Sequence, residues 1–189
     1  VTSVTDASVT EGGNLTHTVT LSNASSVPTT FAFSLAGNTA SAGDFGAPSF
    51  TNGVTLAAGN ITVPAGVTSF DVSYPTSNDT TDEPDETVDL SVGGVAAVGT
   101  IVDNDFSPVL DLDASDISTG YTTTFTENGA AMAIADTDVS ITDVDSSNIA
   151  GATITLTNAQ AGDVLAAGGM PPGITASVAE MLEALQRVA

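Results

Sequence analysis

The feature that most constrains the fold is an alternation of apolar and polar residues that recurs along residues 1–105. Its clearest instance is Leu15, His17, Val19 and Leu21, which alternate with threonines. A period of two residues is typical of a strand with one buried and one exposed face. Similar alternations, separated by turn residues rich in Gly, Asn and Pro, lie at 31–35, 54–56, 61–63, 70–74 and 88–92. About seven short strands at this spacing predict an antiparallel sandwich.

A second unit is predicted to begin at residue 106, where Ser107 and Pro108 mark a boundary. The strand candidates in this unit are residues 109–113, 122–126, 139–142 and 152–156. Residues 178–188 have apolar residues at helical spacing, and Ser177 with Glu180 fits a capping box, so a short amphipathic helix is predicted there.

The predicted fold class is therefore all-β, with two tandem immunoglobulin-like, Greek-key β-sandwiches. The first covers residues 1–105. The second covers residues 106–189 and is expected to be incomplete, because a helix is predicted at its C-terminus where a sandwich needs further strands.

The charge of the chain excludes several classes of partner. There are 23 acidic residues and one basic residue, which gives a net charge of −22. Nucleic acid and anionic lipid both require a basic face, so neither is expected as a partner. No apolar run approaches the length of a membrane span, so membrane insertion is not expected either. Divalent cations would relieve the self-repulsion of such a chain.

The acidic residues are densest in residues 78–86, which contain five carboxylates, and two more follow in residues 103–105. Carboxylates packed closely raise one another's pKa values unless a cation neutralises them. Calcium accepts roughly 6–8 oxygen ligands from carboxylates, carbonyls and amides. Two interpretations follow from composition alone: a calcium loop, or a solvated acidic loop.

Catalytic chemistry has little support in the sequence, and the protein is expected not to be an enzyme. The only histidine, His17, shares a face with Leu15 and Val19, which indicates a partly buried structural residue. There is no Gly-X-Ser-X-Gly elbow, and the absence of cysteine excludes thiolate zinc sites.

Residues 1–105 resemble a Calx-beta domain, a calcium-binding sandwich found in sodium–calcium exchangers and in very large bacterial surface proteins. The matching pieces are Val9-Thr10-Glu11-Gly12-Gly13, Thr39-Ala40-Ser41-Ala42-Gly43-Asp44-Phe45, Pro64-Ala65-Gly66, Asp85-Glu86-Thr87 and Ile101-Val102-Asp103-Asn104-Asp105. The resemblance implies calcium as the cofactor. The carboxylates that it implies as ligands are Glu11, Asp44, Asp79, Glu83, Glu86, Asp103 and Asp105.

The same resemblance implies a backbone carbonyl ligand at Thr81. Asn78 and Asn104 are candidate metal ligands as well, but they mark a departure, because they stand where the family often has Asp. Fewer charges imply fewer ions or weaker binding than in the most acidic members of the family.

Residues 106–178 are similar to the cadherin-like modules that follow Calx-beta repeats in secreted bacterial RTX-type adhesins. The pieces that carry this similarity are Thr126-Glu127-Asn128-Gly129, Asp143-Val144-Asp145 and the linker Asp103-Asn104-Asp105-Phe106-Ser107-Pro108. The similarity implies that Asp143 and Asp145 share ions with Asp103 and Asp105, and that Glu127 is a metal ligand at the far end of the module.

Two further acidic residues of this unit, Asp111 and Asp113, alternate with leucines. They are expected on the outer face of a strand, with a metal-ligand role as the alternative.

The function expected from these resemblances is that of a calcium-rigidified extracellular extender or adhesion module, part of a large bacterial surface or matrix protein. Its partners would be neighbouring domains of the same or identical chains. One alternative is a self-assembling subunit of an extracellular filament or sheath, a homopolymer completed by strand exchange. Another is a carbohydrate-binding accessory domain, which the absence of Trp disfavours.

Overall fold

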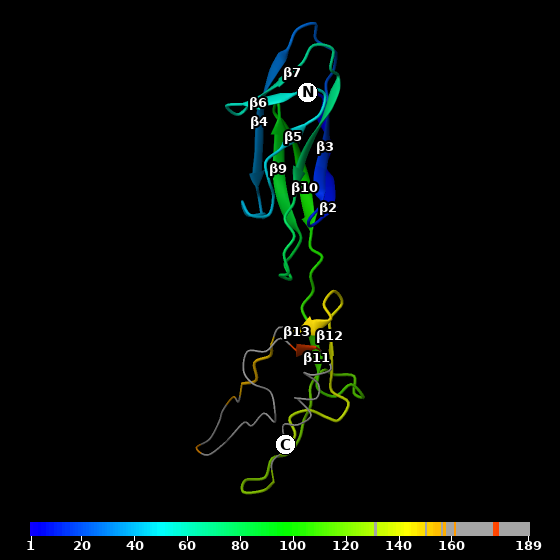
Figure 1. Ribbon diagram of the computed structural model, residues 1–189, viewed down its shortest axis with the longest axis vertical. Coiled ribbons are helices and arrows are strands. Elements are labelled where there is room, and N and C mark those ends of the chain that lie inside the picture. The colour runs from blue at the N-terminus through cyan, green and yellow to red at the C-terminus, as the bar shows by residue number, and fades with distance from the viewer. Residues whose placement is uncertain (131, 150, 156, 158–160, 162–175, 178–189) are drawn as a thin grey trace. The chain divides into compact units, whose positions relative to one another are not determined.

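The computed structural model describes residues 1–130, 132–149, 151–155, 157, 161 and 176–177. The chain divides into two units, Val1–Asp105 and Phe106–Ala189 (Figure 1). The described residues form strands and no helix, which confirms the predicted all-β class. The helix predicted over residues 178–188 lies outside the described residues. Within the described part of the chain, no helix has the length and apolar character needed to cross a membrane.

Unit 1 is a sandwich of two sheets. The four-stranded sheet has the order β1-β3-β8-β5, with every neighbouring pair antiparallel. Its strands are β1 (Ser3–Val4), β3 (Asn14–Thr20), β8 (Ser69–Pro75) and β5 (Ser49–Phe50). The alternations at 15–21 and 70–74 correctly predicted β3 and β8. The two-residue strands β1 and β5 are too short to show a period.

The six-stranded sheet of unit 1 has the order β2-β10-β9-β4-β7-β6. Its strands are β2 (Ala7–Thr10), β10 (Val95–Val102), β9 (Glu86–Val92), β4 (Thr29–Gly37), β7 (Asn60–Val63) and β6 (Thr55–Ala57). The pair β2·β10 is parallel, whereas the other neighbouring pairs are antiparallel. β2 comes first along the chain among these six strands and β10 comes last. They therefore lie side by side and run in the same direction.

The core of unit 1 consists mainly of alternate side chains of these strands, and Ala40 and Val54 join it from the loops. On β3, Leu15, His17 and Val19 are buried while the threonines between them are exposed. The buried hydrophobic residues of the core clusters are Leu15, Val19, Ala40, Val54, Ile61, Val63, Phe70, Val72, Tyr74, Val88, Leu90, Val92 and Ile101. The period-two pattern of the sequence thus corresponds to burial between the sheets.

His17 lies in this core with an exposed fraction of 0%. Its Nδ1 lies 2.7 Å from the carbonyl oxygen of Thr5, so Nδ1 carries the proton and donates it. In the neutral ring Nε2 is then an acceptor, and the Tyr74 hydroxyl, 3.0 Å away, donates to it. Burial raises the pKa of Tyr74 to about 12, which keeps that hydroxyl protonated. His17 is structural, as predicted, but fully rather than partly buried.

Gly99 on β10 allows the two sheets to approach each other at Tyr74, and Gly99→Ala should destabilise unit 1. A Cβ at this position would lie 2.3 Å from the Tyr74 hydroxyl oxygen and 3.0 Å from both δ-carbons of Leu15. Both neighbours are buried, and the hydroxyl is bonded to His17. We expect a loss of about 1–3 kcal/mol in the free energy of unfolding, measured by urea denaturation.

Gly120→Ala is the matched control for this substitution, because a Cβ there meets nothing within 4 Å. Equal denaturation midpoints for the two variants would contradict the close approach at Gly99.

The described part of unit 2 contains two short antiparallel pairs. β11 (Val109–Asp111) pairs with β12 (Ser140–Thr142), and β13 (Asn148–Ile149) pairs with β14 (Ala176–Ser177). The buried hydrophobic residues near these pairs are Ala135, Val139, Ile141 and Ile149. The strand predicted over 139–142 is present, and the one predicted over 109–113 ends at residue 111.

Two expectations for unit 2 were wrong. Residues 122–126 and 152–155 are not strands; Thr122–Thr124 provide no apolar face, and Phe125 is 61% exposed. The outer-face expectation for Asp111 and Asp113 also fails. Asp111 and Asp113 are half-buried, Leu110 is 42% exposed, and β11 ends before Asp113.

Candidate metal centre

Strand register brings distant acidic residues to one end of unit 1. In the parallel pair β2·β10, Thr10 is the partner of Val102, so Glu11 and Asp103 follow at the same sheet end. The Glu11 N–H continues this ladder by donating to the Val102 carbonyl at 3.1 Å. The antiparallel pair β9·β10 places Glu86 opposite Ile101, so β9 begins at this end as well (Figure 1).

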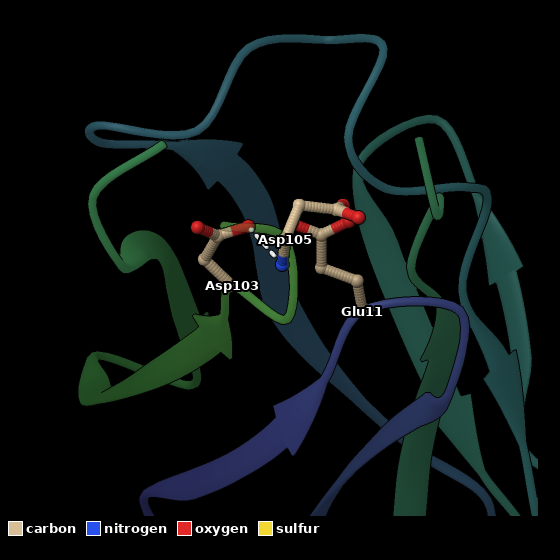
Figure 2. Close-up of side chains that lie close together, drawn as sticks. All are labelled: Glu11, Asp103 and Asp105. Atoms are coloured by element: carbon tan, nitrogen blue, oxygen red, sulfur yellow. Dashed lines mark hydrogen bonds between the residues drawn. The ribbon is translucent and has the colours of Figure 1, made fainter. Parts of the chain in front are cut away.

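Three carboxylates gather at this end: Glu11, Asp103 and Asp105, which we call the tricarboxylate group. One oxygen from each lies within 4.8 Å of the others, and all three residues are half-buried. Figure 2 shows that Glu11 follows β2 while the two aspartates lie on the segment after β10. The Asp105 N–H donates to Asp103 Oδ1 at 3.2 Å, which fixes the turn of that segment.

The acidic loop, residues 76–85, is fastened to the tricarboxylate group by backbone N–H donors. The Glu83 N–H donates to Asp103 Oδ2 at 3.0 Å, and the Asp79 N–H donates to Glu11 Oε2 at 3.4 Å. In the opposite direction, the Asp103 N–H donates to Asp85 Oδ1 at 3.2 Å. Asp85 was not among the predicted site residues, although it lies in the acidic run and begins the Asp85-Glu86-Thr87 piece of the Calx-beta resemblance.

Within the tricarboxylate group, the pKa values of Glu11 and Asp103 shift in opposite directions. Burial raises the pKa of Glu11, and a hydrogen bond with Asp103 and the charges of Asp103 and Asp105 raise it further. The hydrogen bond from the Asp79 N–H lowers this pKa but does not cancel the rise. Desolvation also opposes ionisation of Asp103, but N–H donors from Glu83 and Asp105 and the bond with Glu11 outweigh it and lower its pKa. Of these two carboxyls, therefore, Glu11 is the weaker acid and Asp103 the stronger.

Besides the tricarboxylate group, unit 1 contains a pair of hydrogen-bonded carboxyl groups, Asp44 and Glu86. Burial, a hydrogen bond with Asp44, and the charges of Asp44, Glu83 and Glu11 raise the pKa of Glu86 to about 7. The loop that carries Asp44 is joined to the acidic loop, because the Ser77 N–H donates to the Asp44 carbonyl at 2.8 Å. The Asp44 carboxylate accepts from the Ser41 N–H within its own loop.

The raised pKa of Glu86 predicts that the metal-free protein loses stability as the pH rises from about 4.5 to 7. In the unfolded chain this carboxyl titrates near 4.5, whereas the folded protein holds the proton to about 7. The folded state therefore binds more protons in this window, and the free energy of unfolding falls with rising pH. Glu86→Gln should flatten that dependence, measured as urea midpoints in chelator at pH 5 and 7.5.

Asp89→Asn provides the control for this measurement, since Asp89 is an exposed residue of β9. A Glu86→Gln protein with the same pH dependence as wild type would contradict the raised pKa of Glu86.

The remaining predicted residues of unit 1 lie along the acidic loop and its neighbours. The Asn104 side-chain amide donates to Asn78 Oδ1 at 3.1 Å, and the Thr81 N–H donates to Asp79 Oδ1 at 2.7 Å. Asn78, Asp79 and Thr81 are exposed. Every residue predicted as a ligand in unit 1 therefore lies in the acidic loop, the Asp44 loop, or at the adjoining ends of β2, β9 and β10.

In unit 2, Asp143 and Asp145 are hydrogen-bonded to each other. This bond lowers the pKa of Asp143 and raises that of Asp145. Asp145 Oδ2 also accepts from the Phe106 N–H at 2.7 Å. Glu127 is exposed, in a turn that the Gly129 N–H closes onto the Thr126 carbonyl at 2.9 Å. The sharing of ions between the Asp143–Asp145 pair and the linker stays a prediction.

A further group consists of Asp113, Asp136 and Asp138 in unit 2, of which only Asp113 was considered from the sequence, as an alternative ligand. One oxygen from each lies within 4.8 Å of the others. The Asp136 N–H donates to the Leu112 carbonyl at 2.8 Å, which holds the two segments together. Asp-Thr-Asp at residues 136–138 was the available sequence signal, and it carries no family motif of its own.

The donor set at the end of unit 1 consists of oxygen atoms. Carboxylates, amide carbonyls and backbone carbonyls suit hard cations such as calcium and magnesium. Zinc prefers sulfur and imidazole ligands, but the chain has no cysteine and its one histidine is bonded within the core. The residues present fit a hard divalent cation.

Comparisons with known proteins give similarities to solved structures alone. No protein-family model matches the chain, and no curated protein matches it in sequence. The described fold is similar to the crystal structure of CBD12 from CALX1.2, with a TM-score of 0.41 and 23% sequence identity. The aligned part covers 54% of this chain and 43% of that chain, so the match spans less than half of that structure. At these values the similarity does not define the family of the chain.

Proposed function

We propose that unit 1 is a calcium-binding module and that bound calcium stabilises the end of the sandwich where the tricarboxylate group lies. The observation that carries this proposal is the approach of Glu11, Asp103 and Asp105 to within 4.8 Å of one another. The chain has only one Lys or Arg in its entire length. The described residues include no Lys or Arg. Three half-buried carboxylates close together are costly when ionised, and a divalent cation removes that cost.

The tricarboxylate group would hold the ion, with Asp79, Glu83, Asp85 and the Asp44–Glu86 pair as the neighbouring oxygen donors. Calcium would supply positive charge and no covalent chemistry. The protein's own contribution is to bring the ends of β2 and β10 and the acidic loop to one place before an ion arrives. The ion would then add its coordination to the hydrogen bonds that already join these segments.

The wider role that we propose is mechanical and non-enzymatic. Unit 1 would be an extender or adhesion module of a large extracellular protein, with neighbouring domains as its partners. Its support is the Calx-beta resemblance, the two-sheet architecture and the acidic loops at one end. Extracellular calcium-binding modules work at roughly 0.1–1 mM. A module of this affinity would be ion-free inside a cell and loaded outside it.

Isothermal titration of the full chain with calcium tests the proposal. We expect saturable binding with a dissociation constant of roughly 0.1–1 mM at moderate ionic strength, and weaker binding of magnesium, which demands a tighter octahedral shell. A featureless titration to about 10 mM calcium, well above that range, would refute calcium binding.

A further inference from the structure

Two asparagines join the three chain segments of the candidate centre without any ion. The Asn104 side-chain amide donates to Asn78 Oδ1 at 3.1 Å, and the Asn78 side-chain amide donates to the Asp79 carbonyl at 3.0 Å. Asn104 lies between Asp103 and Asp105, and Asn78 begins the acidic run. The bond between the two side chains therefore links the segment after β10 to the acidic loop.

The third segment, the turn after β2, packs against the same side chain. Gly12 has a φ of +74°, and a Cβ there would lie 3.1 Å from Asn78 Cβ and 3.2 Å from Asn78 Oδ1. The Gly12 N–H donates to the Ser77 carbonyl at 3.1 Å. Asn78 thus occupies the space beside Gly12 that a larger residue in that turn would take.

We propose that Asn78 and Asn104 are positioning residues, an amide clasp that keeps the acidic loop in its binding arrangement when no ion is present. This inference rests on the proposed calcium function but concerns the ion-free state. An amide has both a donor and an acceptor, so two amides can bond to each other. Two carboxylates at the same positions would have only acceptors when ionised, and would repel each other.

The clasp reduces the ordering of the acidic loop that must accompany calcium binding. A loop already in place requires little ordering when the ion binds, because the conformational entropy was lost on folding. With carboxylates at both positions this side-chain link would be lost without an ion, and the loop would depend on the backbone N–H bonds of Asp79 and Glu83. The two asparagines therefore make the local order of residues 76–85 less dependent on calcium.

Amide hydrogen exchange of the full chain in chelator tests the clasp. The double variant Asn78→Asp, Asn104→Asp should exchange at least about tenfold faster than wild type in residues 76–85, since one hydrogen bond and a new repulsion each contribute on this scale. Addition of calcium should restore its protection. The single variant Asn78→Asp should keep wild-type protection in chelator, because the Asn104 amide can still donate to a carboxylate.

Asn23→Asp, Asn60→Asp is the control, since it adds the same charge at two exposed residues outside the centre. It should leave the exchange of residues 76–85 unchanged. Equal exchange of wild type and the Asn78→Asp, Asn104→Asp variant in chelator would overturn the clasp. If calcium alters no variant while the chelator results hold, the proposed calcium function fails and the clasp stands.

Discussion

The melting temperature of unit 1 should rise by roughly 10–20 °C between excess chelator and saturating calcium. A ligand at 100 times its dissociation constant adds about 2.7 kcal/mol to the free energy of unfolding. For a domain of this size, each kcal/mol shifts the midpoint by about 4–8 °C. Differential scanning calorimetry of the full chain measures the shift, and the midpoint should rise further as calcium is added beyond saturation.

Magnesium at the same concentration is the control for this shift. It supplies the same charge but demands near-octahedral coordination and releases its waters reluctantly, so a smaller rise is expected. Equal midpoints in chelator and calcium would end the calcium interpretation of the acidic loop. Equal shifts with both ions would point instead to general screening of the −22 charge.

Asp103→Asn should weaken calcium binding by about 10- to 100-fold or more. Loss of a partner that only orients a metal ligand already costs about this much, and Asp103 lies within the tricarboxylate group itself. Its carboxylate also accepts the N–H groups of Glu83 and Asp105, so the change affects both the charge of the centre and the attachment of the loop. Isothermal titration at fixed ionic strength gives the ratio of dissociation constants.

Asp89→Asn removes the same charge from an exposed position on β9 and should change the dissociation constant little. A comparable loss of affinity in both variants would mean that calcium is attracted by a diffuse acidic surface rather than held at one place. In that case the arrangement of Glu11, Asp103 and Asp105 would have no special importance.

The strands of unit 1 could be predicted where their side chains alternate over several residues. β3 and β8 each run for seven residues and contact the core with every second side chain, so the buried face is visible in the sequence. β2 buries its alternate side chains only partly, and β1 and β5 are held in register mainly by their partners. Local pattern cannot reveal a strand that depends on a distant neighbour.

The candidate centre shows the same limit. Composition identified the acidic run, and the Calx-beta resemblance identified Glu11 and Asp103 as candidate ligands. These two residues are 92 positions apart in the sequence. Their proximity depends on the parallel register of Thr10 with Val102, which no local sequence feature encodes. Asp85 was missed for a related reason, because its contact is with the backbone of Asp103 rather than with another side chain.

Unit 2 shows how alternation can mislead. Residues 109–113 alternate leucine with aspartate, but the strand pairs over only three residues and leaves Leu110 substantially exposed. Asp113 instead lies near Asp136 and Asp138. The carboxylates of this segment are arranged by the turns that bring residues 112 and 136 together, and turn geometry outweighs a short alternation.

The parallel pairing of β2 with β10 also determines how unit 1 carries tension. A pull between the start of β2 and the end of β10 draws these neighbours in opposite directions along their length. The backbone hydrogen bonds between Ala7–Thr10 and residues 99–102 are then loaded in shear and must break together, whereas the bonds of a peeled hairpin break one after another. Glu11 and Asp103 continue the same two strands, so an ion held between them would fasten the loaded ladder at the point where it ends.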